Sequence, residues 1–250
     1  MKRATIDFNL KLSAKMNRAE SADGEPVILK LTDEHEAEVL RRLHRNQPMK
    51  QTRIIPLLDV VGGRLIVLPQ LTPLPLFLAF DASIGDIGQL ALQFLEGVAI
   101  MHHSSVAHLD LKPDNIVVQR DPDSKKVDLY IVDFNISVFA DAEPTTSESY
   151  GTAGWCAPEV EAGEPYNPLL ADRWSCGRVL VFFTDRMKPS QMRETMRLWS
   201  QRLMDTNPSL RPPVADVAKL CLQEIGRTLN PLIKRQGMKR KRSNVSGGSN

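Results

Sequence analysis

Three prolines lie within the stretch PQLTPLPLF at residues 69–77, and this stretch constrains the fold more than any other feature of the chain. Proline lacks a backbone N–H and clashes inside a helix, so we expect a connector in which neither a helix nor a central strand continues. Strand patterns precede it and mostly helical patterns follow it. We therefore predict an α+β fold in two lobes, at residues 1–72 and 73–226, followed by a tail at residues 227–250.

The first lobe is predicted to hold a short antiparallel sheet and one helix. Residues 25–31, EPVILKL, follow a turn signal and have an apolar strand pattern. A helix is predicted at residues 32–46, with Thr32 or Asp33 as its N-cap. Residues 52–71 read as two strands joined by a Gly-Gly turn. The inward-facing stripe of the helix comprises Glu36, Val39, Leu40 and Leu43.

The second lobe is predicted to be mainly helical, with one hairpin in it. Residues 87–103 are apolar nearly all round, which indicates a buried helix. Residues 115–120 and 126–134 favour a β-hairpin, and the aperiodic residues 136–158 favour a long functional loop. Further helical patterns lie at residues 169–183, 191–204 and 213–229.

The hairpin brings oxygen-bearing side chains together. Asn115 precedes its first strand and Asp133 ends its second, while Asp110 lies five residues before Asn115 in HLDLKPDN. Magnesium prefers such oxygen ligands and completes its shell with water and phosphate oxygens. Asp110 could orient a hydroxyl nucleophile and accept its proton. Lys112 could neutralise charge on a transferring phosphoryl group.

Several motifs occur in a characteristic order between residues 26 and 226. They are VILK, Glu36, HLDLKPDN, DFN, GTAGWCAPE, DRWSCG and NPSLRP. This ordered set resembles the eukaryotic protein kinases, and Lys112-Pro113 is similar to the serine/threonine-specific form of the catalytic loop. The resemblance implies a kinase-like two-lobe fold with a shortened N-lobe sheet. It also implies ATP and Mg²⁺ as cofactors and a protein bearing Ser or Thr as substrate.

The resemblance also implies roles for particular residues. Asp110 and Lys112 would be catalytic, and Asn115 and Asp133 would hold the metal. Lys30 would reach the α- and β-phosphates and pair with Glu36. Glu38 is the competing partner, but only Glu36 lies on the apolar stripe. The nucleotide-binding set comprises Lys30, Glu36, Asn115, Val117 and Asp133, with Pro69 and Leu71 at the adenine edge through a backbone carbonyl and N–H.

The resemblance to protein kinases also implies supporting roles for three further positions. Glu159 would pair with Arg211 and so tie the GTAGWCAPE segment to the late helices. Asp172 would hold the catalytic-loop backbone from a buried helix. Thr152 would sit beside Asp110 and Lys112, close to the substrate hydroxyl.

The chain departs from the family pattern near the nucleotide. No G-x-G-x-x-G element precedes the VILK strand, because Gly24 is the first glycine. Residues 5–16 could form one strand of the corresponding hairpin but not its loop. Ile28 replaces the usual alanine on the strand face of Lys30 and would press on the adenine pocket. Overpacking of this kind costs about 1–3 kcal/mol.

Other departures concern regulation and substrate docking. Leu109 replaces the arginine that usually receives an activation-loop phosphate, which removes the usual anchor for phosphorylation but no catalytic group. Asn135 replaces the glycine after Asp133-Phe134, and asparagine is the residue that next best tolerates positive φ. The region between DRWSCG and NPSLRP is short, which indicates a reduced substrate-docking helix.

Two other functions also fit parts of the sequence. A pseudokinase, a binding or regulatory module without turnover, would explain the absent glycine loop and Ile28. A small-molecule phosphotransferase shares an Asp-Asn-Asp arrangement. The segments GTAGWCAPE and DRWSCG argue against the latter, because they resemble protein-substrate kinases.

Composition bears on location rather than on function. Cys156, Cys176 and Cys221 are too widely spaced for a zinc site or a redox pair, and an odd count favours a reducing compartment. The N-terminus lacks the apolar core of a signal peptide, and no apolar run could span a membrane. We expect an intracellular protein, cytoplasmic or nuclear, without a membrane partner.

The segment at residues 234–242 is strongly basic. It could be a nuclear-localisation patch, a nucleic-acid contact or a solvated tail. No interleaved aromatic residues are available for base stacking, which argues against nucleic acid as a partner.

Overall fold

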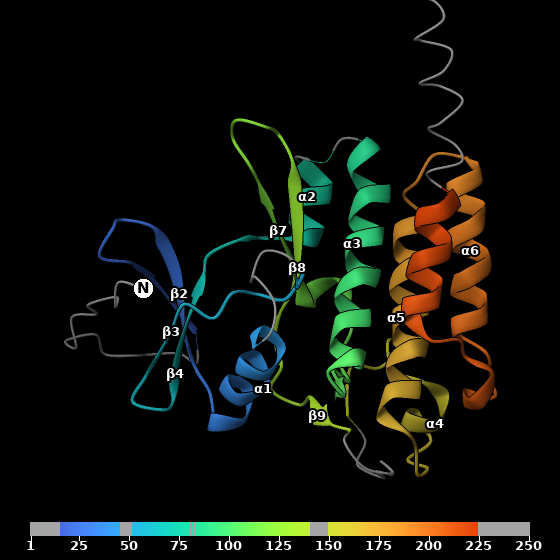
Figure 1. Ribbon diagram of the computed structural model, residues 1–250, viewed down its shortest axis with the longest axis horizontal. Helices are drawn as coiled ribbons and strands as arrows, with labels where there is room; N and C mark the ends of the chain where they lie inside the picture. The colour runs from blue at the N-terminus through green and yellow to red at the C-terminus, as the bar shows by residue number, and fades with distance from the viewer. Residues whose placement is uncertain (1–15, 46–51, 81, 83, 141–149, 225–250) are drawn as a thin grey trace, which may run out of the picture.

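The computed structural model describes residues 16–45, 52–80, 82, 84–140 and 150–224. Figure 1 shows a twisted sheet with one helix on one side of the molecule and a larger, mainly helical part on the other. This arrangement is the predicted α+β, two-lobe fold. The lobe boundaries at residues 72/73 and 226/227 stay predictions, and the tail at residues 227–250, with its basic patch, lies outside the described residues.

The first sheet has four antiparallel strands in the order β1-β2-β4-β3. The glycine turn predicted between β3 and β4 is confirmed, since Gly62 and Gly63 both have positive φ, which glycine adopts without steric cost. The segment in which the family places its glycine-rich loop falls within residues 1–15, outside the described residues. The strands are β1 (Met16–Glu20), β2 (Pro26–Leu31), β3 (Asp59–Val61) and β4 (Leu65–Pro69).

The helix α1 (Glu34–His44) contributes its apolar stripe to a buried cluster that also includes Ile66 and Leu68 of β4. Its N-cap is Asp33, whose side chain accepts a hydrogen bond from the N–H of Glu36. All four residues of the predicted inward stripe are buried, and Glu38 is exposed. The predicted helix and its orientation are therefore confirmed.

The prediction that no helix continues in the proline-rich connector was wrong, whereas the strand found there is an edge strand and not a central one. The connector contains β5 (Thr72–Pro73) and leads directly into α2 (Leu74–Phe80). Pro75 lies in the first turn of α2, where a missing N–H costs nothing, and Pro73 lies in an edge strand. The prolines therefore start elements here instead of preventing them.

The larger part contains the predicted hairpin. Its strands β7 (Ile116–Arg120) and β8 (Val127–Ile131) pair antiparallel, and β5 joins them at the edge of β7. Two short strands, β6 (Val106–Ala107) and β9 (Val138–Phe139), form a separate pair. The predicted loop at residues 136–158 is thus interrupted by β9, and its residues 141–149 lie outside the described residues.

The predicted helices of the larger part are also present. Figure 1 shows α3, α5 and α6 running side by side away from the sheet. Residues 214–224 form one more helix at the end of the described chain. The other helical elements are α3 (Ile84–His103), η2 (Pro113–Asn115), α4 (Pro158–Glu161), α5 (Pro168–Thr184), α6 (Gln191–Leu203) and η3 (Pro208–Leu210).

One apolar cluster extends through both parts of the molecule. It includes Leu40 of α1, Ile66 of β4, Leu95 of α3 and Phe183 of α5, all of them buried. A bridge between Ile54 and Ile131 adds a backbone link between the two parts. This shared core holds the sheet against the hairpin, and therefore positions the cleft between them.

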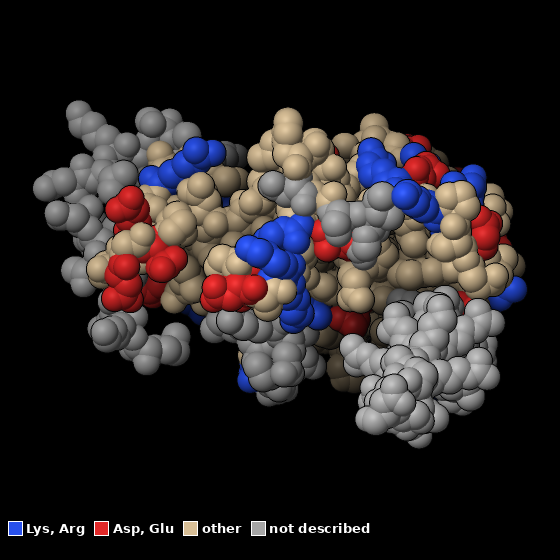
Figure 2. Space-filling model, turned by 90° about the horizontal axis from the view of Figure 1, so that it is seen from above, with Lys and Arg blue, Asp and Glu red and all other residues tan. Residues whose placement is uncertain are grey.

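The surface charge and the character of the helices bear on nucleic-acid and membrane contacts. On the face shown in Figure 2, acidic and basic side chains are interspersed, and no single basic band crosses the described surface. Within the described residues, no helix combines the length and the apolar character that crossing a membrane requires.

Candidate active site

A cavity of about 420 Å³ lies between the first sheet and the β7–β8 hairpin. Apolar residues such as Ile28 and Leu68 line it beside charged ones, a composition that suits a nucleotide with an apolar base and a charged phosphate chain. The predicted nucleotide-binding residues that line it are Lys30, Pro69, Leu71, Asn115, Val117 and Asp133.

The predicted ion pair between Lys30 and Glu36 is present. Lys30 Nζ lies 2.8 Å from Glu36 Oε1, and both side chains are buried. Glu36 is fixed further by the hydroxyl of Thr32 at 2.9 Å and the N–H of Phe134 at 3.2 Å. Because Glu38 is exposed, the structure selects Glu36 from the two candidates.

Two more acceptors surround the Lys30 ammonium. Its Nζ lies 2.6 Å from Asp133 Oδ1 and 2.8 Å from Asn135 Oδ1. An ammonium carries three N–H donors, so Glu36, Asp133 and Asn135 together use all of them. The contact with Asn135 was not predicted. The sequence feature that could have indicated this contact is the amide side chain of Asn135, at a position where the family has glycine.

The backbone explains how Asn135 reaches Lys30. Asparagine replaces the family's glycine here and is the residue that next best tolerates positive φ. Positive φ occurs instead at Asp133, at 71°, and Asn135 does not have it. An aspartate tolerates this conformation better than most residues. The turn therefore directs both the carboxylate of Asp133 and the amide of Asn135 toward Lys30.

We predict that Asn135→Gly tightens the binding of phosphate-bearing nucleotides. The substitution frees one Lys30 donor for a phosphate oxygen, and a hydrogen bond contributes about 0.5–1.5 kcal/mol, or about two- to tenfold in affinity. Calorimetric titration with ADP measures the change. Adenosine has no phosphate, so its affinity is the internal control and stays unchanged. Weaker ADP binding would show that Asn135 assists the phosphates instead.

Three side chains hold the carboxylate of Asp110. Lys112 Nζ lies 2.6 Å and Asn115 Nδ2 lies 2.9 Å from Oδ2, and Thr152 Oγ1 donates to Oδ1 at 2.7 Å. Lys112 Nζ also donates to Thr152 Oγ1 at 2.6 Å. A carboxylate has about four acceptor positions, so one on Oδ1 remains for a further donor. Asp110 is thus oriented and still able to accept a proton.

Asn115 and Asp133 present oxygens that suit a magnesium ion. Both Nδ2 bonds of Asn115 go to Asp110, to its carboxylate and its backbone oxygen, each at 2.9 Å. Within the described residues, Asn115 Oδ1 and Asp133 Oδ2 have no hydrogen-bond donor. Magnesium takes one or two carboxylates plus water and phosphate oxygens, so this donor set fits it. The described residues contain no cluster of three His, Cys, Asp or Glu residues that would form an all-protein metal site.

The catalytic-loop backbone is held from α5 as predicted. Asp172 is fully buried and accepts from the N–H groups of His108 at 2.6 Å and Leu109 at 2.8 Å. Leu109 has φ of 64°, which is costly for a leucine, and these bonds stabilise it. Its side chain packs with Cys156 and Tyr166 in a buried apolar cluster. Leu109 thus contributes packing and carries no catalytic group.

Cys156 is not a candidate nucleophile, although it lies close to this loop. Burial, followed by the nearby carboxylate of Glu161, raises the pKa of the Cys156 thiol. A thiol with a raised pKa is protonated near neutral pH, and the thiolate is the reactive form.

The predicted pair between Glu159 and Arg211 is also present. Arg211 Nη1 and Nη2 lie 2.6 Å and 2.9 Å from the two oxygens of Glu159. The guanidinium also donates to the carbonyls of Asp205 and Leu170, both at 2.9 Å. This bidentate pair ties α4 to the segment after α6.

Ile28 lines the cavity next to Lys30, as strand alternation predicts. We predict that Ile28→Ala increases nucleotide affinity on the order of tenfold, because it relieves overpacking against the base. Titration with ADP measures this change. Leu58→Ala is the matched control, since Leu58 is 43% exposed and lies outside the cavity. An unchanged affinity would remove Ile28 as an obstacle to nucleotide binding.

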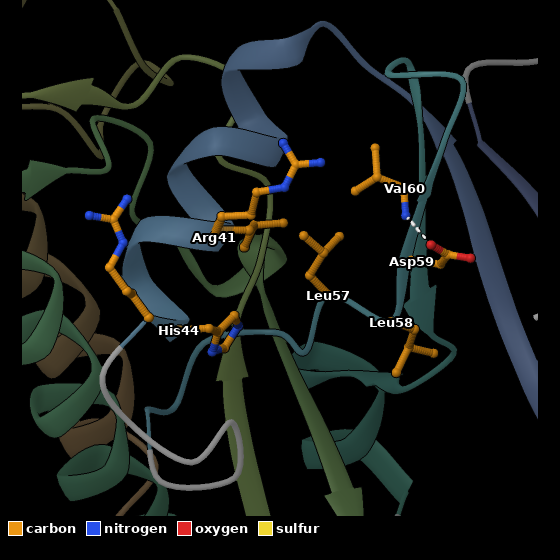
Figure 3. Close-up of a pocket in the computed structure, with 8 residues that line it drawn as sticks. Arg41, His44, Leu57, Leu58, Asp59 and Val60 are labelled. Carbon is orange, nitrogen blue, oxygen red and sulfur yellow. Dashed lines mark hydrogen bonds between the residues drawn. The ribbon is translucent and has the colours of Figure 1, made fainter. Parts of the chain in front are cut away.

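Leu58 lines a different hollow, between α1 and residues 57–60. Figure 3 shows Arg41 and His44 of α1 facing Leu57 and Leu58 across it. None of the predicted site residues lines this hollow. This hollow therefore has no part in the chemistry that the sequence predicts.

The family model described as the protein kinase domain matches residues 31–236. The chain belongs to this family. Proteins of this family use ATP and Mg²⁺ and act on protein substrates.

Curated relatives agree with this assignment. The serine/threonine-protein kinase SAPK4 of Oryza sativa subsp. japonica is 32% identical over 56% of this chain and 39% of its own length. The serine/threonine-protein kinase ppk8 of Schizosaccharomyces pombe is 34% identical over 52% and 26%. The calcium/calmodulin-dependent protein kinase type IV of Homo sapiens is 28% identical over 58% and 30%. The chain thus spans less than half the length of each of these relatives.

Proposed function

We propose that this chain is a serine/threonine protein kinase that transfers the γ-phosphoryl group of ATP to a hydroxyl of a protein substrate. The observation that carries this proposal is the Asp110 carboxylate, which Lys112, Asn115 and Thr152 hold while one acceptor position on Oδ1 stays open. A group held in this way can align a hydroxyl and take its proton.

The residues in and around the nucleotide cavity have complementary roles. Lys30, anchored by Glu36, would contact the α- and β-phosphates, and the backbone at Pro69 and Leu71 would bind the adenine edge. Asn115 Oδ1 and Asp133 Oδ2 would hold magnesium, which neutralises phosphate charge when bound. Val117 would contribute apolar lining against the base.

Lys112 supports both the chemistry and the substrate class. Its ammonium contacts Asp110 and Thr152, so it lies where charge on the transferred phosphoryl group would develop. Lys112-Pro113 is the form of the loop found in serine/threonine kinases, and SAPK4 and ppk8 carry that description in their names.

The test combines binding with transfer. Purified protein incubated with γ-labelled ATP, Mg²⁺ and a mixture of Ser/Thr peptides is expected to label the peptides, and nucleotide is expected to raise its melting temperature. Thermal stabilisation without any transfer would overturn the proposal. That result would leave the binding-module alternative, which no comparison favours.

A further inference from the structure

The face of α5 that lies beside the GTAGWCAPE segment is only partly covered by the residues that the structure describes. As predicted from the short spacing, only residues 185–190 separate α5 from α6 in sequence, and no helix lies between these two. Arg178 and Phe182 of α5 are consequently only partly buried. Phe182 contacts Trp155 with ring centroids 6.4 Å apart, so aromatic rings and an arginine share this face.

Arg178 is held rigidly on this face. Its guanidinium carbon lies 5.8 Å from the ring centroids of both Trp155 and Trp174. Its Nε donates to the carbonyl oxygen of Gly154 at 3.1 Å. Stacking and this hydrogen bond reduce the rotamer freedom that a bound anion would otherwise have to remove.

The charged end of Arg178 remains available for a ligand. Among the described residues, no acceptor contacts Nη1 or Nη2, and no carboxylate forms an ion pair with Arg178. Glu161, on the other side of Gly154, bonds the N–H of Gly154 at 2.8 Å and the thiol of Cys156 at 3.6 Å instead. A planar guanidinium with two free NH₂ groups suits a carboxylate.

Arg178 also lies near the reacting centre. Gly154 is two residues from Thr152, whose hydroxyl donates to Asp110 at 2.7 Å. Two residues span at most about 7 Å between Cα atoms, which equals about two residues of an extended substrate. The N–H of Trp155 bonds the carbonyl of Thr152 at 2.9 Å, so the segment turns back and keeps Arg178 close.

The local charge favours an acidic ligand. The short segment after α5 carries Arg186 and Lys188 against one acidic residue, Asp185. The Arg186 guanidinium is stacked on Phe182 at 3.6 Å. An acidic residue close to the phosphoacceptor would therefore gain a partner at Arg178 and meet a net positive charge on this segment.

We propose that Arg178 selects protein substrates with an aspartate or glutamate within about three residues of the phosphoacceptor hydroxyl. The carboxylate would bind the free Nη1 and Nη2 groups while the stack with Trp155 and Trp174 holds the arginine in place. This proposal rests on the proposed kinase function, and it adds the substrate class that the same site accepts.

The experiment compares peptide pairs that differ only by Asp against Asn at each position within three residues of a single serine. The wild-type protein is expected to prefer the acidic member at one position by up to about fivefold in kcat/KM, the effect of one partly exposed ion pair. Arg178→Gln is expected to remove the preference and Arg178→Glu to reverse it in favour of a Lys peptide. Loss of a merely structural arginine would lower kcat/KM for both peptides equally and leave their ratio unchanged.

A binding measurement separates this proposal from the kinase function. Fluorescence anisotropy measures the binding of the labelled acidic and neutral peptides without turnover, and the same preference for the acidic peptide is expected. Arg197→Gln, at an exposed position of α6, is the surface control and is expected to keep this preference. Transfer to both peptides at equal rates would overturn the role of Arg178 and leave the kinase function standing. Selective binding of the acidic peptide through Arg178 without any phosphoryl transfer would support the role of Arg178 and overturn the kinase function.

Discussion

Asp110→Asn is expected to lower the rate of phosphoryl transfer by about a hundredfold to ten-thousandfold, the range that a positioned general base contributes. The amide has the same size as the carboxylate, and its oxygen can still accept a hydrogen bond from the Thr152 hydroxyl. It cannot accept the substrate proton, and it no longer carries the negative charge that Lys112 contacts at 2.6 Å. Single-turnover kinetics with γ-labelled ATP measure the loss.

The binding of nucleotide separates a catalytic effect from a structural one. Asp110 does not line the cavity in which Lys30 and Val117 lie, so ADP affinity is expected to stay within a fewfold of wild type. Asp123→Asn is the matched control, because Asp123 is exposed in the β7–β8 turn. Equal transfer rates for wild type and Asp110→Asn would exclude Asp110 as the base.

The elements around this residue were predictable because their signals are local. The β7–β8 hairpin follows from two apolar strands separated by a turn-rich segment, and it places Asn115 and Asp133 at the same end. The periodic stripe of α1 selected Glu36 over Glu38. In each case a short window of sequence contained the whole pattern.

The remaining features depend on contacts between distant segments or on position within an element. Asn135 reaches Lys30 across 105 residues, and no local pattern encodes that contact. Pro75 was read as a helix breaker, yet the first turn of α2 accepts it because no N–H is needed there. Sequence patterns predict candidate residues of this site, whereas the partners of each polar atom require the fold.

Arg211→Met is expected to lower the free energy of unfolding by about 3–5 kcal/mol, the cost of removing one partner of a buried ion pair. The Arg211 side chain is fully buried, and Glu159 is 11% exposed. Without the guanidinium, the Glu159 carboxylate and the carbonyls of Asp205 and Leu170 lose their donor. Urea unfolding, compared with the exposed substitution Arg197→Met, measures the difference.

The double variant Glu159→Gln/Arg211→Met shows whether charge or packing dominates this loss. If the unpaired Glu159 carboxylate is the main cost, removing its charge restores part of the stability, and the double variant is more stable than Arg211→Met alone. If the effects of the two substitutions simply add, the pair is not coupled and α4 is held by the carbonyl contacts of Arg211. Because α4 follows directly on the segment with Thr152, the coupled result also predicts weaker transfer in Arg211→Met at temperatures where it is still folded.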